Sequence, residues 1–369
     1  MDTVSFDLPP RFTTTDSLVV SFQSAVQRVQ QLTVSQQAST AYEFTAQQFI
    51  FNVRDYMEVF GKSAIAEIGT KVEANVSALA ETNTFRFYGD GVTNISSYLQ
   101  LGNALAFFRN FGAAKDNTKG YLSDITFPGI INSGLNQFTI EKNNREMMSW
   151  EIGKFSNCDW YQSNLLKTHT AGTEGNDGSV LTVVSTVTNS EGGVIQITFS
   201  GTAAADDPNS IMTYDKFQFS DGVAGQPNLR FLTFIGHQPT QSPVQFRATA
   251  NAASTGGSQV TVNIYPALQA AAGQDQNITS PIVAGMQVTV LPTHRCGLMT
   301  AGNPLYLAMP KLPEEVPYPT SVAQDPNSGA SLRQYFGSLF GQNQRGMVHD
   351  IIWGSTLVDE YSMMIALPM

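Results

Sequence analysis

Apolar and polar residues alternate along short segments between Gly172 and Thr293. Segments such as VLTVVSTVT, GVIQITFS and QVTVNIY repeat with a period of two, and turn clusters such as SEGG and STGGS separate them. This alternation is typical of strands with one buried face. The pattern predicts an all-β barrel or sandwich inserted into the chain, with no helix of ten residues in it.

A different period precedes this region, because apolar residues recur at spacings of three and four from Phe49 to Leu79. That spacing predicts an amphipathic helix from Ala46 to about Thr82, roughly 55 Å long at about 1.5 Å per residue. Thr45 and Gln48 fit the capping box that begins a helix. A helix of this length is typical of a strut that organises the layers around it.

The remaining segments mix helices and strands. A second helix is expected over Ile95–Phe111, with its buried face formed by Leu99, Leu101, Leu105 and Phe108. A further helix is expected around Thr139–Trp150. After Cys296 we expect a short element near Leu305–Met309 and then strands through GASLRQYF, MVHDIIWG and SMMIALPM. The fold class is therefore α+β, with a β module interrupting one body.

Apolar and polar residues alternate only in short stretches within residues 1–44. This segment is rich in Gln and contains too few apolar residues for a core of its own. They predict an extended two-stranded loop, which needs another surface to lie on. A neighbouring subunit could supply that surface, with Arg11 and Phe12 as candidate contacts.

Charge and composition narrow the function. The 369 residues carry a net charge of -10, and only 14% are charged against 42% hydrophobic. The absence of a basic run disfavours direct nucleic-acid binding. No signal-peptide or membrane-spanning pattern is present, so we expect a soluble chain made in the cytoplasm. The two cysteines, Cys158 and Cys296, have neither disulfide nor zinc spacing.

One stretch, GKFSNCDWYQSNLLKTHTAGTEG, brings Cys158, Asp159 and His169 close together in sequence. A cysteine nucleophile with a histidine base is one interpretation, and it would make the chain a hydrolase. The alternative is structural, since alternation would place Cys158, Trp160 and Gln162 on one face of a strand, where cysteine is usually part of a core. The second interpretation is favoured because known cysteine-enzyme signatures are absent.

The same stretch resembles the major capsid proteins of tailed phages, in the branch with an inserted β domain found in short-tailed Salmonella phages. The residues that carry the resemblance here are Asp159, Trp160, Ser163, Asn164, His169, Thr170, Gly172 and Thr173. Further along, the matching residues are Ile264, Tyr265, Pro266, Ala267, Gly329, Ser331, Leu332, Arg333, Asp350 and Gly354. Near the start, DTVSFDLPPRFTT is similar to the opening of the family's extended loop.

The resemblance implies the Johnson-type, Hong Kong 97-like capsid fold. Its parts would be an extended loop (1–45), a peripheral domain with the spine helix (46–114 and 334–356), an axial domain (115–171, 294–333 and 357–369) and an inserted β domain (172–293).

The resemblance further implies a structural protein, not an enzyme, with no catalytic, cofactor-binding or metal-binding residues. Its copies would form hexamers and pentamers in the icosahedral head of a virion, assembled in the bacterial cytoplasm around double-stranded DNA. Scaffolding and portal proteins are expected partners, and a decoration protein is a possible one. A β-rich fibre or receptor-binding protein is the alternative function that the β module leaves open.

Overall fold

The computed structural model describes residues 3–14, 22, 27–45, 60–112, 117–134, 152–234, 236–314, 318–325, 329–338 and 344–369. The chain divides into two compact units. Unit 1 comprises residues 1–8, 29–76 and 305–357, and unit 2 comprises residues 9–28, 77–304 and 358–369. Among the described residues, no helix is both long and apolar enough to cross a membrane.

Unit 1 is built on a sheet of five strands with the order β18-β21-β20-β19, in which β3 also pairs with β21. The long strand β21 forms antiparallel pairs with β3, from Thr45 opposite Gln344 to Gln36 opposite Trp353. Strands β1 and β2 form a separate pair. The bounds are β1 (Thr3–Leu8), β2 (Arg28–Thr33), β3 (Gln36–Thr45), β18 (Leu305–Ala308), β19 (Thr320–Gln324), β20 (Ser331–Ser338) and β21 (Gln344–Leu357).

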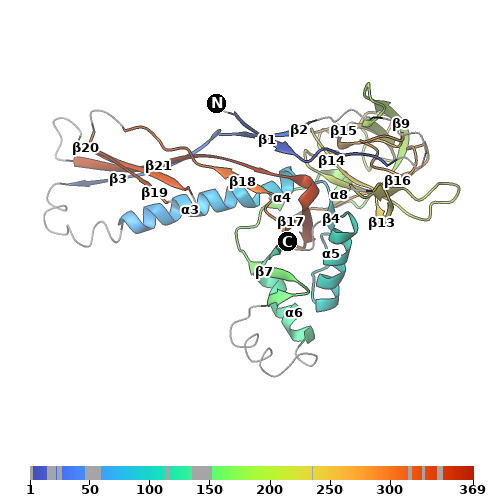
Figure 1. Ribbon diagram of the computed structural model, residues 1–369. Coiled ribbons are helices and arrows are strands. Elements are labelled where there is room, and N and C mark those ends of the chain that lie inside the picture. The colour runs from blue at the N-terminus through green and yellow to red at the C-terminus, as the bar shows by residue number, and fades with distance from the viewer. Residues whose placement is uncertain are drawn as a thin grey trace. The chain divides into compact units, whose positions relative to one another are not determined.

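Helix α3 (Lys62–Ser77) runs along this sheet (Figure 1). Its buried Ile68 packs against Ile351 and Trp353 of β21, and Trp353 is completely buried. Ile68 and Val72 of the predicted apolar face thus lie toward the sheet, but the prediction for Ile65 is wrong, since it is 44% exposed. The part of the predicted long helix from Ala46 to residue 59 lies outside the described residues.

The body of unit 2 contains a mixed sheet with the order β4-β22-β17-β5-β7-β6, and β8 also pairs with β17. Strand β22 is buried at every position. The strand bounds are β4 (Phe87–Tyr88), β5 (Thr118–Leu122), β6 (Gly153–Phe155), β7 (Cys158–Gln162), β8 (Thr168–His169), β17 (His294–Ala301) and β22 (Ser362–Leu367). The helical segments are α4 (Leu79–Thr82), α5 (Tyr98–Asn110), η2 (Asp124–Thr126), α6 (Phe127–Gly134), α8 (Thr173–Asn176) and η3 (Asp359–Tyr361).

Helix α5 begins at Tyr98, three residues after the predicted start at Ile95, because its first turn is capped by Ser97. The Ser97 hydroxyl accepts from the backbone N–H of Gln100, and the Gln100 side chain accepts from the N–H of Ser96. Leu101, Leu105 and Phe108 are buried as predicted, but the prediction for Leu99 is wrong, since it is 73% exposed. Tyr98 takes the core position instead, which rotates the buried face by one residue.

The region of alternating segments forms a closed barrel with the strand order β10-β15-β14-β11-β16-β9. This resolves the choice between barrel and sandwich. Three phenylalanines, Phe199, Phe217 and Phe246, stack inside it, and the centroids of the rings of Phe217 and Phe246 are 4.9 Å apart. The bounds are β9 (Val180–Thr188), β10 (Val194–Ser200), β11 (Lys216–Phe219), β14 (Gln245–Ala248), β15 (Gln259–Leu268) and β16 (Gln287–Val290), with the separate pair β12 (Arg230–Leu232) and β13 (Pro239–Pro243).

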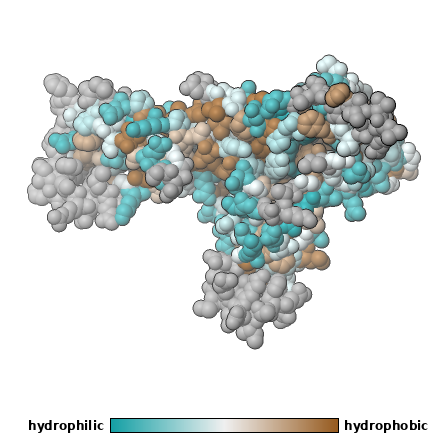
Figure 2. Space-filling model, in the orientation of Figure 1, coloured by the Kyte–Doolittle hydropathy of each residue, from teal (hydrophilic) through white to brown (hydrophobic). Residues whose placement is uncertain are grey.

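The outer face of the barrel is mixed in character. Figure 2 shows hydrophilic and hydrophobic residues interspersed there, at the upper right. Exposed valines on β9, such as Val184 and Val187, alternate with threonine and serine rather than with charged residues. The strand β9 thus has an apolar interior face and an uncharged exterior of valine, threonine and serine, and a period of two produces this division into two faces.

The chain leaves the body sheet and returns to it at neighbouring positions. His169 of β8 is the antiparallel partner of His294 of β17, and the barrel strands lie between them in sequence. The stretch that contains the candidate cysteine therefore ends where the chain passes into the barrel.

Candidate functional site

Cys158 and His169 do not form a nucleophile and base. Cys158 lies on β7 between β5 and β6, is completely buried, and belongs to the apolar cluster that includes Leu101 and Phe108. Burial raises the pKa of its thiol to about 12. A thiol in this state is protonated at neutral pH and is a poor nucleophile.

The strand of Cys158 was predicted only in part. Trp160 is buried on the same face, as expected, but Gln162 is exposed. Asp159 is half-buried on the opposite face, where its strand partners are Lys119 of β5 and Lys154 of β6. The helix expected around Thr139–Trp150 lies outside the described residues.

His169 is buried and bound on both sides. Its Nδ1 lies 2.7 Å from a carboxylate oxygen of Glu81, and its Nε2 lies 2.7 Å from one of Asp215. Burial alone would lower the pKa of His169, but its hydrogen bonds to Asp215 and Glu81 outweigh this and raise it. Both ring nitrogens are occupied, so neither is available to deprotonate Cys158.

A second cation, Lys216, follows Asp215 in the chain and lies at the start of β11. Its ammonium donates to the backbone carbonyl oxygens of Glu81 (2.8 Å) and Thr84. It thereby satisfies carbonyl groups at the end of α4, which the helix itself leaves without partners. Burial lowers the pKa of Lys216 to about 7.

The junction connects α4, β8, β11 and β17 of unit 2. Glu81, Asp215 and Lys216 were not recognised as site residues in the sequence. The one available signal was a charged pair, Asp215 and Lys216, at the start of the apolar strand KFQF in a region with few charges.

Arg11, one of the two candidate contacts to a neighbouring subunit, forms an ion pair within its own chain. Its guanidinium donates to Glu360 at 2.5 Å, and Arg28 donates to the same oxygen. Burial alone would raise the pKa of Glu360, but the hydrogen bond from Arg28 and the charges of both arginines lower it. Phe12, the second candidate contact, is 55% exposed.

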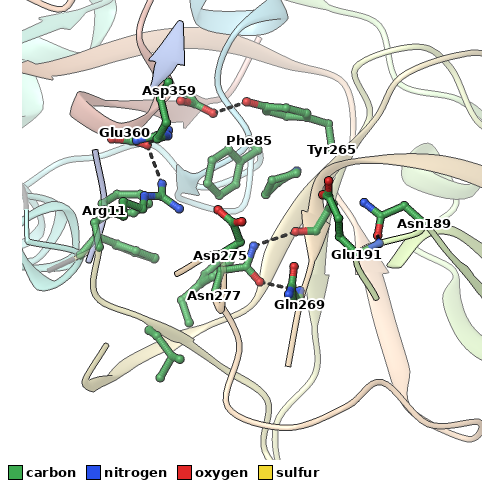
Figure 3. Close-up of a pocket in the computed structure, with 17 residues that line it drawn as sticks. Arg11, Phe85, Asn189, Glu191, Tyr265, Gln269, Asp275, Asn277, Asp359 and Glu360 are labelled. Carbon is green, nitrogen blue, oxygen red and sulfur yellow. Dashed lines mark hydrogen bonds and ion pairs between the residues drawn. The ribbon is translucent and has the colours of Figure 1, made fainter. Parts of the chain in front are cut away.

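Arg11, Arg28 and Glu360 border a cavity of about 300 Å³ in unit 2. Figure 3 shows Arg11 beside Glu360, and the Tyr265 hydroxyl donates to Asp359 at 2.6 Å. Polar side chains, including Glu191 and Asp275, also line this cavity. Within the described ranges, no group of three or more His, Cys, Asp or Glu side chains could hold a metal ion.

Comparisons with known proteins give matches only among solved structures. No family model matches the sequence, and no curated protein matches it. A structure from Mycobacterium phage Che8 matches with 7% identity and a TM-score of 0.46, over 99% of this chain and 83% of that one. The capsid structure of cyanophage P-SCSP1u matches with 10% identity and a TM-score of 0.42, over 100% and 83%.

The mature capsid of bacteriophage PhiM1 matches with 7% identity and a TM-score of 0.41, over 99% of this chain and 82% of that one. Similarity at this level carries no argument about the fold or the function of this chain.

Proposed function

We propose that this chain is the major capsid protein of a tailed phage, whose copies assemble into an icosahedral head around double-stranded DNA. The observation that carries the proposal is the order of the elements. Strand β3 and helix α3 precede the mixed sheet in the chain, and β18–β21 complete the antiparallel sheet on which α3 packs before the last strand, β22, returns to the mixed sheet. A closed barrel is inserted between β8 and β17, two paired strands of the mixed sheet. Of the motif residues of the sequence resemblance, His169 lies where the chain leaves the mixed sheet for the barrel, and Arg333 and Asp350 are partners across β20 and β21.

The finer assignment follows the same resemblance. The fold would be of the Johnson type in its inserted-domain branch, with residues 172–293 as the inserted domain. The motif residues and the order of the elements support this assignment. The expected partners are copies of this chain in hexamers and pentamers, with scaffolding and portal proteins and, for some shells, a decoration protein.

The chemistry of the described residues supports a structural role. The buried Cys158 thiol and the doubly bound His169 give no nucleophile with its base, which weighs against a Cys-His hydrolase. The net charge of -10 favours retention of DNA by enclosure rather than by tight binding. Strong, salt-sensitive retention of DNA by the purified chain on a filter would contradict this part of the proposal.

Negative-stain microscopy of the purified full chain tests the proposal. Round shells of uniform diameter are expected. Trimers or elongated particles would instead support a fibre or receptor-binding protein. The variant Phe12→Ser tests whether residues 1–44 contact a neighbouring subunit. If the exposed Phe12 makes such a contact, the variant should give a folded monomer that does not assemble into shells. Deletion of residues 1–44 is less suitable, since it also removes β3 from the unit 1 sheet.

A further inference from the structure

We propose that Glu81, His169 and Asp215 form a proton-dependent latch that holds the last turn of α4 to the junction of the barrel and the body sheet. The latch is closed when His169 is an imidazolium and opens on its Glu81 side when the ring becomes neutral. This inference concerns the single chain and does not depend on shell formation.

The geometry requires the charged ring in the closed state. Ionised carboxylates only accept hydrogen bonds, and each lies 2.7 Å from a different nitrogen of His169. An imidazolium has two N–H groups and can donate to both. A neutral imidazole has one, so in either tautomer one carboxylate would face an unprotonated nitrogen at hydrogen-bond distance.

The Asp215 side of the latch is the firmer one. The Asp215 side chain is completely buried, and its second oxygen accepts from the backbone N–H groups of Gly172 and Met212. The Glu81 side chain retains 12% exposure and can turn toward water. Deprotonation therefore leaves the remaining N–H on Asp215 and releases the Glu81 carboxylate, so that α4 loses its side-chain contact to His169 and keeps the backbone contacts to Lys216.

The surroundings of the ring keep the charge on His169. His294, whose ring centroid lies 5.3 Å away, donates from Nδ1 to the Pro292 carbonyl, its Nε2 lies 3.4 Å from the Met364 sulfur, and burial lowers its pKa to about 4. His294 is thus neutral when His169 titrates. The titratable and charged groups around the latch are Glu81 of α4, Asp215 and Lys216 at β11, Arg247 of β14, His294 and Cys296 of β17, and Lys167 before β8.

The direction of the pH effect follows from linkage. The pKa of His169 is raised in the folded chain. Its contribution to the stability of the fold is therefore fully present below the ordinary histidine pKa of 6.5, and it is lost as the pH rises through the pKa of His169 in the folded chain. Raising the pH should therefore loosen α4 while the interior of the barrel stays closed.

Hydrogen exchange followed by mass spectrometry tests this on the full chain between pH 6 and pH 9, with each rate corrected for intrinsic exchange. The reporters are the amides of Glu81, Thr82 and Asn83, which donate to carbonyls within α4 and its cap. Their protection should fall about tenfold or more, the size expected for loss of one charged hydrogen bond. Amides of β15 serve as the internal reference. Constant protection of the reporters across this range would overturn the latch.

Two variants separate the latch from a general effect of pH. His169→Gln should give low protection that does not decrease as the pH rises, and a remaining decrease would overturn the proposal. His237→Asn is the matched control, because it removes a histidine of the barrel at a positive φ of 46° that asparagine tolerates. It should keep the full pH dependence.

A direct titration keeps the proposal testable if His169→Gln does not fold. The chain has four histidines, so 13C-labelled histidine gives few ring signals to assign by NMR. The midpoint of His169 should lie above 6.5 and should decrease in Glu81→Gln, where the carboxylate is replaced by an amide of similar size. A midpoint at or below 6.5, or one that Glu81→Gln leaves unchanged, would overturn the proposal.

Discussion

Arg333 and Asp350 face each other across β20 and β21 and form a two-pronged ion pair. Nε of Arg333 donates to one oxygen of Asp350 at 2.9 Å, and a terminal nitrogen donates to the other. Both residues are buried, and Arg333 also donates to the carbonyl of Pro313. Both belong to the motifs that carry the sequence resemblance.

Removal of one partner should leave a buried charge without compensation. Arg333→Met is expected to lower the free energy of unfolding by about 3–5 kcal/mol, and Arg333→Met combined with Asp350→Leu should recover much of that loss. Urea unfolding measures both. The control is Arg230→Met, which breaks an ion pair with the half-exposed Asp221 and should cost about 1 kcal/mol or less. Equal losses in the two single variants would contradict the prediction.

Gly120 of β5 lies directly under the ring of Trp160. A Cβ at this position would come within 2.4 Å of two ring carbons, and the ring is held in the core. Gly120→Ala should therefore destabilise the chain by about 1–3 kcal/mol through overpacking.

The matched substitution is Gly102→Ala in α5, where the new methyl group meets nothing within 4 Å. It should stabilise the chain by about 0.5–1 kcal/mol, because alanine is the better helix former. Thermal unfolding of both variants gives the comparison, and a stable Gly120→Ala variant would show that the Trp160 ring can move aside.

Both cysteines should be unreactive in the folded chain. Cys158 and Cys296 are completely buried, and burial raises the pKa of each thiol to about 12. A thiol reagent such as DTNB should label neither in the native protein and both after denaturation. Rapid labelling of one cysteine in the native chain would reopen the hydrolase interpretation, and Cys158→Ala would then identify the reactive position.

Lys216 should make the chain more stable as the pH rises from 7 to 10. Its pKa is lowered from 10.5 to about 7 by burial, so the unfolded chain binds more protons in this interval. The neutral amine still has the N–H groups needed for both carbonyls.

Lys216→Met should lack this contribution, which for the wild type is on the order of a few kcal/mol. The measurement is the difference in the free energy of unfolding between wild type and variant at several pH values. His169 acts in the opposite direction in both proteins, so the difference isolates Lys216. A difference that stays constant with pH would refute the assignment.

The sequence predicted those elements whose pattern is local. Alternation located the barrel strands, and the apolar spacing located α5 to within three residues of its start. Leu99 was wrongly assigned to the buried face of α5. Neighbouring side chains on a helix point about 100° apart, and a spacing of three to four residues does not specify which of two neighbouring positions is buried.

Pairing between distant segments was not visible in the same way. Nothing local in β3 specifies β21 as its partner, and closure of the barrel depends on β9 pairing with both β10 and β16. The partners of His169 were missed for the same reason, since Glu81 and Asp215 lie far from it in sequence.

The pairing of β3 with β21 also has a consequence for synthesis. Thr45 of β3 pairs with Gln344 of β21, which is synthesised about 300 residues later. The body sheet likewise contains β22, a fully buried strand near the end of the chain. Neither sheet can therefore form completely on a nascent chain that still lacks these strands. The barrel strands, by contrast, all lie between Val180 and Val290. We expect the barrel to fold first, while the two sheets remain open and depend on chaperones until the late strands leave the ribosome.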